Sequence, residues 1–197
     1  MEHIGKPVTD FQRAETMASD EPICTICEGK QSRENLTGER KKSEELLHTI
    51  YSDVYRPPAT TGLMGEWYFT TLIYAWSGRI AISLLKQKSE VFERFKQYKA
   101  KVERETGKKI KSHRCDGGGE YTGNAFQSYL MEHRITQRIS PAYTPGHNGT
   151  TERANRTIME MVRCMLFYSG LGKEFWGFAV LTAVHIINRL PPSWREN

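Results

Sequence analysis

The feature that most constrains the fold is a change of hydrophobic period near residue 88. Before it, three segments rich in aromatic and β-branched residues follow one another: Leu46–Tyr55, Trp67–Tyr74 and Arg79–Leu85. Pro57-Pro58 ends the first segment, and Ser77-Gly78 makes a tight turn after the second. The three segments therefore predict an antiparallel meander of three strands.

After this meander, apolar residues recur at the spacing of a helix. The pattern predicts a helix over Ser89–Thr106, with Ser89 as N-cap and Gly107 as the residue that ends it. A strand at Ile110–Asp116, a short helix at 123–133 and a strand at Ile135–Ile139 follow.

The remaining pattern predicts a loop and two helices. Pro141–Gly149 contains two prolines and two glycines and is expected to be the loop. Thr150 or Thr151 then caps a helix that runs to about Tyr168, and a last helix spans about Lys173–Arg189. The order β-β-β-α-β-α-β-α-α predicts an α/β fold, a mixed five-stranded sheet with helices on both faces.

Composition and length divide the chain into three parts. We expect residues 1–42 to be poorly structured, residues 43–191 to form the core domain, and residues 192–197 to be a short tail. No apolar run approaches the roughly 20 residues that a membrane helix needs, so we expect no membrane partner. The first residues lack the pattern of a signal peptide, and the spacing of the four cysteines favours a reducing compartment.

The net charge of +5 is compatible with a polyanionic partner. Positive charge is concentrated at residues 38–42 and 108–114. Each cluster is equally well explained as a solvated surface, so charge alone does not decide the function.

Three acidic residues stand at positions where strands or helices meet loops. Asp53 lies on the first strand, Asp116 ends the fourth, and Glu152 opens the helix after the loop. Each has an ordinary explanation, such as the preference of Glu for the first turn of a helix. However, if the first and fourth strands are neighbours, Asp53 and Asp116 lie side by side. The 35 residues between Asp116 and Glu152 can bring that helix start to the same edge.

Converging carboxylates repel one another unless cations neutralise them. Hard oxygen ligands select Mg²⁺ or Mn²⁺. Two such ions about 4 Å apart activate an attacking oxygen and stabilise a leaving oxygen in phosphoryl transfer. Asp53, Asp116 and Glu152 are therefore the predicted catalytic residues and metal ligands, with two ions as the predicted cofactor.

The motifs around these residues resemble those of a known family. The segment Cys115-Asp116-Gly117-Gly118-Gly119-Glu120-Tyr121 is similar to S-D-N-G-G-E-F, and 143–157 is similar to Y-T-P-x-x-N-G-x-x-E-R-x-N-R-T. Ser52-Asp53-Val54 before Pro57, and the segments 174–176 and 188–191, also fit. Over roughly residues 43–191 the chain resembles the D,D(35)E integrase catalytic cores encoded in the Pol polyproteins of copia-type LTR retrotransposons.

This resemblance implies an RNase H-like fold and a DNA-integrating enzyme, a polynucleotidyl transferase. The two aspartates would share one metal ion, and Asp53 with Glu152 would hold the second. Water attacks the element's DNA end first, and the freed 3′-hydroxyl then attacks target DNA. The implied partners are element and target DNA and further copies of the chain, with Phe167 and Trp176 either at the interface or in the core. Nuclear action is inferred from integration, with the cytoplasm as the alternative.

The resemblance also suggests which residues contact DNA. These are Asn148 in the loop and Arg153, Asn155 and Arg156 on the helix that Glu152 opens; a solvated polar helix face is the alternative. His147 is expected to be an ordinary loop residue.

Cys24 and Cys27 resemble the end of the HHCC zinc module that precedes such cores. A structural zinc site needs four ligands, and only His3 lies upstream of the pair. The two residues are therefore either part of a zinc site or free thiols.

The chain also departs from the family pattern. Gly117 replaces the usual Asn, Gly146-His147 replaces a pair of Gln, and Thr150-Thr151 replaces Val-Ala. None of these changes removes the three acidic residues. Two other functions stay open: an inactive, domesticated module that binds DNA or multimerises, and a nuclease of the same fold that cuts without joining.

Overall fold

A computed structural model of the chain describes residues 47–57, 60–140 and 149–190. These residues form a five-stranded mixed sheet in the order β3-β2-β1-β4-β5. The strands are β1 (Thr49–Tyr55), β2 (Tyr68–Tyr74), β3 (Ile80–Leu85), β4 (Ser112–Cys115) and β5 (Thr136–Ile139). The first three pair antiparallel, whereas β4 and β5 run parallel to β1. The predicted α/β fold class is confirmed.

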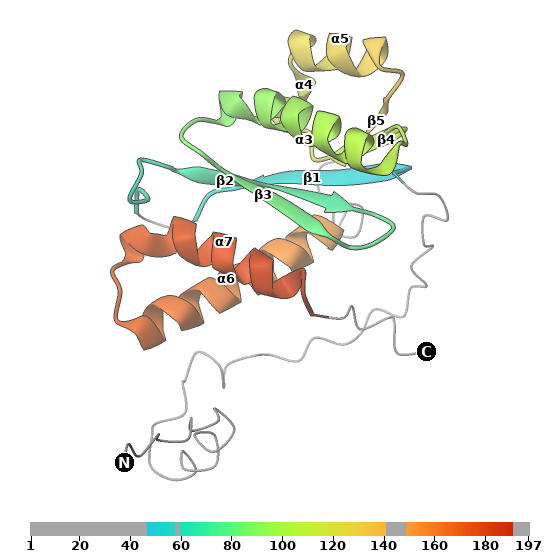
Figure 1. The fold of residues 1–197 in the computed structure, drawn as a ribbon. Helices are drawn as coiled ribbons and strands as arrows, with labels where there is room; N and C mark the ends of the chain where they lie inside the picture. Colours follow the sequence, from blue (N-terminus) through green and yellow to red (C-terminus); the bar gives the residue numbers. More distant parts are fainter. Residues whose placement is uncertain (1–46, 58–59, 141–148, 191–197) are drawn as a thin grey trace, which may run out of the picture. The chain divides into compact units, whose positions relative to one another are not determined.

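Helices cover both faces of this sheet (Figure 1). On one face lie α3 (Val91–Thr106), α4 (Gly119–Thr122) and α5 (Asn124–Glu132); on the other lie α6 (Gly149–Ser169) and α7 (Trp176–Ile187). Two short 3₁₀ helices, Lys88–Glu90 and Lys173–Phe175, precede α3 and α7. No helix in the described ranges is long and apolar enough to cross a membrane.

The alternation of side chains along each strand gives the sheet one core on each face. Towards α3, α4 and α5, Ile50 and Leu72 pack with Phe95 and Phe126. Towards α6 and α7, Phe69 and Ile73 pack with apolar residues of both helices, among them Ile158, Val162, Trp176 and Val180. Because the central strand β1 lies between two cores, a side chain near its end is held firmly in place.

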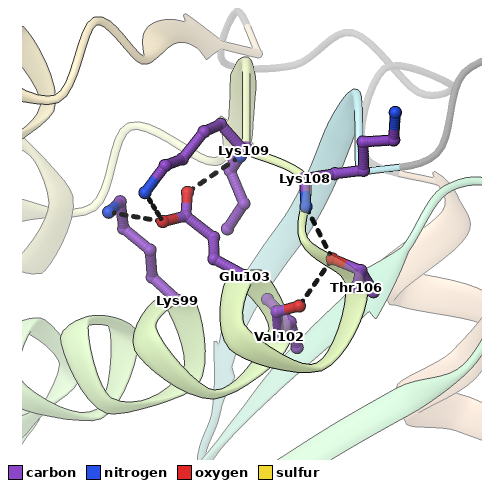
Figure 2. A network of polar contacts seen from close by, with 7 residues as sticks. Lys99, Val102, Glu103, Thr106, Lys108 and Lys109 are labelled. Atoms are coloured by element: carbon purple, nitrogen blue, oxygen red, sulfur yellow. Dashed lines mark hydrogen bonds and ion pairs between the residues drawn. The ribbon is translucent and has the colours of Figure 1, made fainter.

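The end of α3 is joined to β4 by a polar network (Figure 2). Glu103 accepts hydrogen bonds from the ammonium groups of Lys99 (3.0 Å) and Lys109 (3.1 Å), and from the Ile110 N–H (3.0 Å). Gly107 takes the left-handed conformation (φ 67°) that lets the chain leave the helix. The network therefore fixes the start of the segment that leads to Asp116.

Three local features differ from the sequence-based expectation. Ser89 does not cap α3: it lies inside the 3₁₀ helix Lys88–Glu90, and Glu90 is the residue at the N-cap position of α3, without a side-chain cap bond. The Glu90 carboxylate instead accepts the N–H groups of Lys86 and Gln87, ahead of the 3₁₀ helix. The short helix α4 was not predicted, because the glycines before it indicate a turn. Trp176 belongs to the core, whereas Phe167 is 61% exposed.

Candidate active site

Asp53 lies near the end of the central strand, opposite Thr71 of β2. Its Oδ1 accepts the Val54 N–H at 3.0 Å, and its Oδ2 accepts the side-chain amide of Asn155 at 2.8 Å. Both carboxylate oxygens are therefore engaged, and neighbouring groups from β1 and α6 set the orientation of this side chain.

Asp116 directly follows β4. The parallel ladder pairs Tyr51 with Arg114, and the same offset continued by two residues brings Asp116 opposite Asp53. The Gly118 N–H donates to Asp116 Oδ1 at 3.2 Å, so the glycine segment folds back on the carboxylate as in an Asx turn. The predicted neighbourhood of the two aspartates follows from this register.

Glu152 lies in the first turn of α6 and is exposed. With Asp53 it lines a hollow of about 260 Å³, which is also lined by Tyr55, Asn155, Arg156, Met159 and Arg163. The α6 residues among them lie three, four, seven and eleven positions after Glu152, which places them on one face of the helix. Asp116 does not line this hollow. Asp53 therefore lies between the other two acidic residues: it shares the hollow with Glu152 and lies opposite Asp116 in the strand register.

Electrostatics connect the three acidic residues. The pKa of Asp53 is raised from 3.8 to about 7, first by burial and then by the negative charge of Asp116, with a smaller contribution from Glu152. The hydrogen bonds from Val54 and Asn155 act in the opposite direction. A carboxylate with this environment favours either a proton or a metal cation.

The residues fit a divalent cation in chemistry but do not surround one. Carboxylate oxygens are the ligands that Mg²⁺ and Mn²⁺ prefer. Within residues 47–57, 60–140 and 149–190, however, no three His, Cys, Asp or Glu residues lie close enough together to hold one ion. Asp53 and Asp116 lie at neighbouring strand ends, whereas the Glu152 side chain is exposed.

Asn155 differs from the expectation that it contacts DNA. It is 1% exposed, its Nδ2 donates to Asp53, and its Oδ1 accepts the Thr71 hydroxyl at 2.6 Å. A buried polar group is costly unless it is hydrogen-bonded. These two bonds give partners to the Thr71 hydroxyl, the Asn155 amide and the Asp53 carboxylate. Asn155 therefore acts as a support for Asp53 in this structure.

The other predicted DNA contacts are placed in part. Arg153 and Arg156 are both exposed on α6, and only Arg156 lines the hollow. Asn148, His147, Cys24 and Cys27 lie outside the described residues, as do the segments 1–42 and 192–197.

Sequence analysis missed two groups at the site. Met159 and Arg163 continue the face of α6 that carries Glu152 and Arg156, and their spacing of seven and eleven residues after Glu152 is a signal that could have revealed them. Thr71 gave no such signal, because its contact with Asn155 joins residues 84 positions apart.

Relatives of the chain come from plant transposons. It is 43% identical over 169 residues to the retrovirus-related Pol polyprotein from transposon TNT 1-94 of Nicotiana tabacum, covering 85% of this chain and 13% of that protein. It is 35% identical over 149 residues to the Pol polyprotein from transposon RE2 of Arabidopsis thaliana, covering 76% of this chain and 10% of that protein. The chain is a homologue of these copia-type Pol polyproteins.

Solved structures agree on the fold. The HTLV-2 integrase catalytic core domain in complex with magnesium (dimeric form) superposes with a TM-score of 0.54 at 18% identity, over 74% of this chain and 88% of that one. The fold is thus the RNase H-like fold of integrase catalytic cores. No family model matches the chain. The chain spans only about a tenth of the length of the polyproteins it matches.

Proposed function

We propose that this chain is an integrase catalytic core, which cuts and joins DNA strands by metal-dependent phosphoryl transfer. The observation that carries the proposal is the pairing of Asp53 with Asp116 at adjacent strand ends, with a raised Asp53 pKa. The relatives support the family, and the magnesium complex of a protein with the same fold supports the type of cofactor.

Asp53 and Asp116 would hold the metal, and Glu152 would complete the site. Bound there, one or two Mg²⁺ or Mn²⁺ ions would supply Lewis acidity at the attacking and leaving oxygens. Asn155, itself anchored by Thr71, keeps one oxygen of Asp53 in a fixed position. Preorganised ligands of this kind lower the cost of assembling the site.

The reaction comprises two phosphoryl transfers of the same type. In the first, a water oxygen bonds to phosphorus near the element's end and the bond to the 3′ oxygen breaks, which leaves a 3′-hydroxyl on the element. In the second, that hydroxyl bonds to a target phosphorus and loses its proton, and the target's own 3′ oxygen leaves. Arg156 and Arg163 border the hollow beside Asp53 and Glu152, where their positive charge would hold the DNA backbone.

The experiment uses a branched DNA that mimics an integration product, incubated with the protein and Mn²⁺ or Mg²⁺. We expect the branch to be resolved and the target strand to be rejoined, and we expect Asp116→Asn to abolish both. Products that are cut but never joined would identify a nuclease of the same fold. Absence of any metal-dependent product would contradict the proposal and favour an inactive, domesticated module.

We also propose that the protein multimerises. The exposed large apolar residues on α6, on α7 and between the two helices are Phe167, Tyr168, Leu171, Phe178 and Leu181. Large exposed apolar side chains often serve contacts between proteins when they form one patch. Light scattering after size exclusion should give a mass above the 22.7 kDa of one chain, and Leu181→Lys should lower it; a monomeric wild type would contradict this proposal.

A further inference from the structure

A row of three side chains crosses the sheet beside the acidic residues. The strand register places Tyr51 opposite Arg114, and Arg114 opposite Arg138. The Arg114 guanidinium carbon lies 5.8 Å from the centroid of the Tyr51 ring, within the range of a cation–π contact. Arg138, on the strand at the edge of the sheet, is exposed.

This row lies on the face of the sheet that carries Asp53. Neighbouring residues of β4 point to opposite faces, and His113 packs against Phe95 of α3 with ring centroids 4.9 Å apart. Arg114 therefore points to the other face. There α6 packs mainly on β1 and β2, and α7 mainly on β3, which agrees with the exposure of Arg138 beyond them.

The two arginines are a costly arrangement in the protein alone. Like charges directly opposite each other on neighbouring strands are destabilising. The ion pairs between described residues lie on or beside α3, and none of them involves Arg114 or Arg138. A bound anion would offset repulsion between the two charges, and two guanidinium groups from neighbouring strands can bind the oxygens of one phosphate.

The distance to the acidic residues suggests which phosphate this is. Asp116 follows Arg114 by two residues, which corresponds to about 7 Å along a strand. One strand of DNA carries a charge about every 3.4 Å along the helix axis. Because the backbone winds around that axis, neighbouring phosphates of one strand are farther apart than this axial rise. A phosphate bound by the arginine pair would therefore lie one or two nucleotides from one positioned at Asp53 and Asp116.

We propose that Arg114 and Arg138 together bind a phosphate of the DNA strand on which the enzyme acts, one or two nucleotides from the reacting phosphodiester. Tyr51 holds Arg114 against the sheet, whereas Arg138 reaches the backbone from the edge strand. The proposal rests on the proposed function, since it needs DNA at the carboxylates. It assigns a second basic contact, formed by β4 and β5, in addition to the one that Arg156 and Arg163 form on α6.

The first test measures how salt weakens the binding of branched DNA, in Ca²⁺ to prevent turnover. Arg138→Gln removes an exposed charge and should leave the fold intact. Each lost phosphate contact lowers the slope of log affinity against log salt by about 0.9. The ratio of the wild-type affinity for DNA to the variant's affinity should therefore fall about three- to fourfold between 50 and 200 mM salt. Arg104→Gln, in the exposed last turn of α3 on the other face, is the matched control and should leave the slope unchanged.

The second test locates the phosphate. Uncharged methylphosphonates are placed singly at the first to fourth positions on each side of the branch. At one position, one or two nucleotides from the branch, the loss of affinity caused by the methylphosphonate and the loss caused by Arg138→Gln should not add. That position also tells whether the phosphate belongs to the element arm or the target arm.

Each outcome decides something. Full additivity at every position, or equal losses in Arg138→Gln and Arg104→Gln, would overturn the proposal and leave the proposed function standing. A wild-type protein that does not bind branched DNA would overturn both.

Discussion

At the scale of residues, Asn155 links the core of the protein to the candidate site. Sequence reasoning placed it on the face of α6 next to Glu152 and assigned it to DNA. The structure instead buries it between Thr71 and Asp53. Spacing within a helix shows which residues share a face, but only the packing of that helix on the sheet decides which of them stay exposed.

Replacing Asn155 with Ala should cost about 1 to 3 kcal/mol, because the Thr71 hydroxyl and an Asp53 oxygen both lose a buried partner. Since the Asn155 hydrogen bond lowers the Asp53 pKa, its loss should raise that pKa above about 7. Urea unfolding at pH 6 and pH 8 measures both effects, and the destabilisation should be larger at pH 8. An unfolding free energy equal to wild type at both values would contradict the assigned role.

Glu103 offers a second test at this scale. Burial raises its pKa, but the bonds from Ile110, Lys99 and Lys109 outweigh burial and leave the pKa below 4.5. Because the folded-state pKa is lowered, the stabilisation is complete above the unfolded value and is lost as pH falls through the folded value. Glu103→Gln should therefore cost about 1 to 3 kcal/mol at pH 7 and clearly less below pH 4.

Chemical denaturation across this pH range measures that cost. Glu93→Gln is the control, because its ion pair with Lys96 is on the surface. It should leave the stability nearly unchanged, because solvent screens this ion pair. A cost for Glu103→Gln that stays constant down to pH 3.5 would show that its charge is not what stabilises the α3–β4 connection.

At the scale of elements, the sequence predicted types and order well and their ends less well. The five strands and the long helices have strong periodic patterns, so each was found within a few residues. The start of α3 was wrong because Ser89 lies within a short 3₁₀ helix, which the Glu90 side chain closes by folding back on Lys86 and Gln87. The helix α4 was missed because four residues after a glycine run carry no helical period.

The start of α7 depends on contacts that no local pattern reveals. The Glu66 carboxylate is 3% exposed and accepts the Met64 N–H at 2.9 Å. It also lies against Gly177, where a Cβ atom would overlap the carboxylate and approach Leu84 Cδ1 to 3.0 Å. The segment before β2 is thus packed directly on the first turn of α7.

Gly177→Ala should therefore destabilise the protein by about 1 to 3 kcal/mol, although Ala is the better helix former. Thermal unfolding measures the change. Gly172→Ala does not test this contact, so Ala183→Gly is the reference for helix propensity in α7. A Gly177→Ala variant as stable as wild type would show that Glu66 can move aside at no cost.

At the scale of the whole molecule, sheet register determines the site. The register of β1 with β4, continued by two residues, brings Asp53 opposite Asp116. From the sequence, this proximity was expected only on the condition that the first and fourth strands are neighbours. A site of two ions shared among the three carboxylates was also predicted, and no cluster of three metal-binding side chains occurs among the described residues. Side-chain positions that depend on a bound cation cannot follow from a pattern of residues.

Without metal, the proximity of Asp53 to Asp116 should lower the stability of the folded protein. Because the pKa of Asp53 is raised to about 7, its folded state binds a proton more tightly than the unfolded chain. Stability should therefore fall as pH rises from about 4 to about 7. Asp116→Asn removes one cause of the shift, keeps an oxygen for the Gly118 N–H, and should raise the melting temperature by a few degrees at pH 8 without metal. A lower melting temperature for the variant would contradict this electrostatic account.

The most direct test of the central claim, that Asp53, Asp116 and Glu152 act as one metal centre, is a titration with Mn²⁺ at pH 8. Electron paramagnetic resonance reports the free ion, and the melting temperature reports the protein. We expect wild type to bind Mn²⁺ and become more stable, Asp116→Asn to lose both effects, and Glu152→Gln to weaken binding without abolishing it. Equal binding by all three proteins, or none by wild type at millimolar Mn²⁺, would contradict the claim.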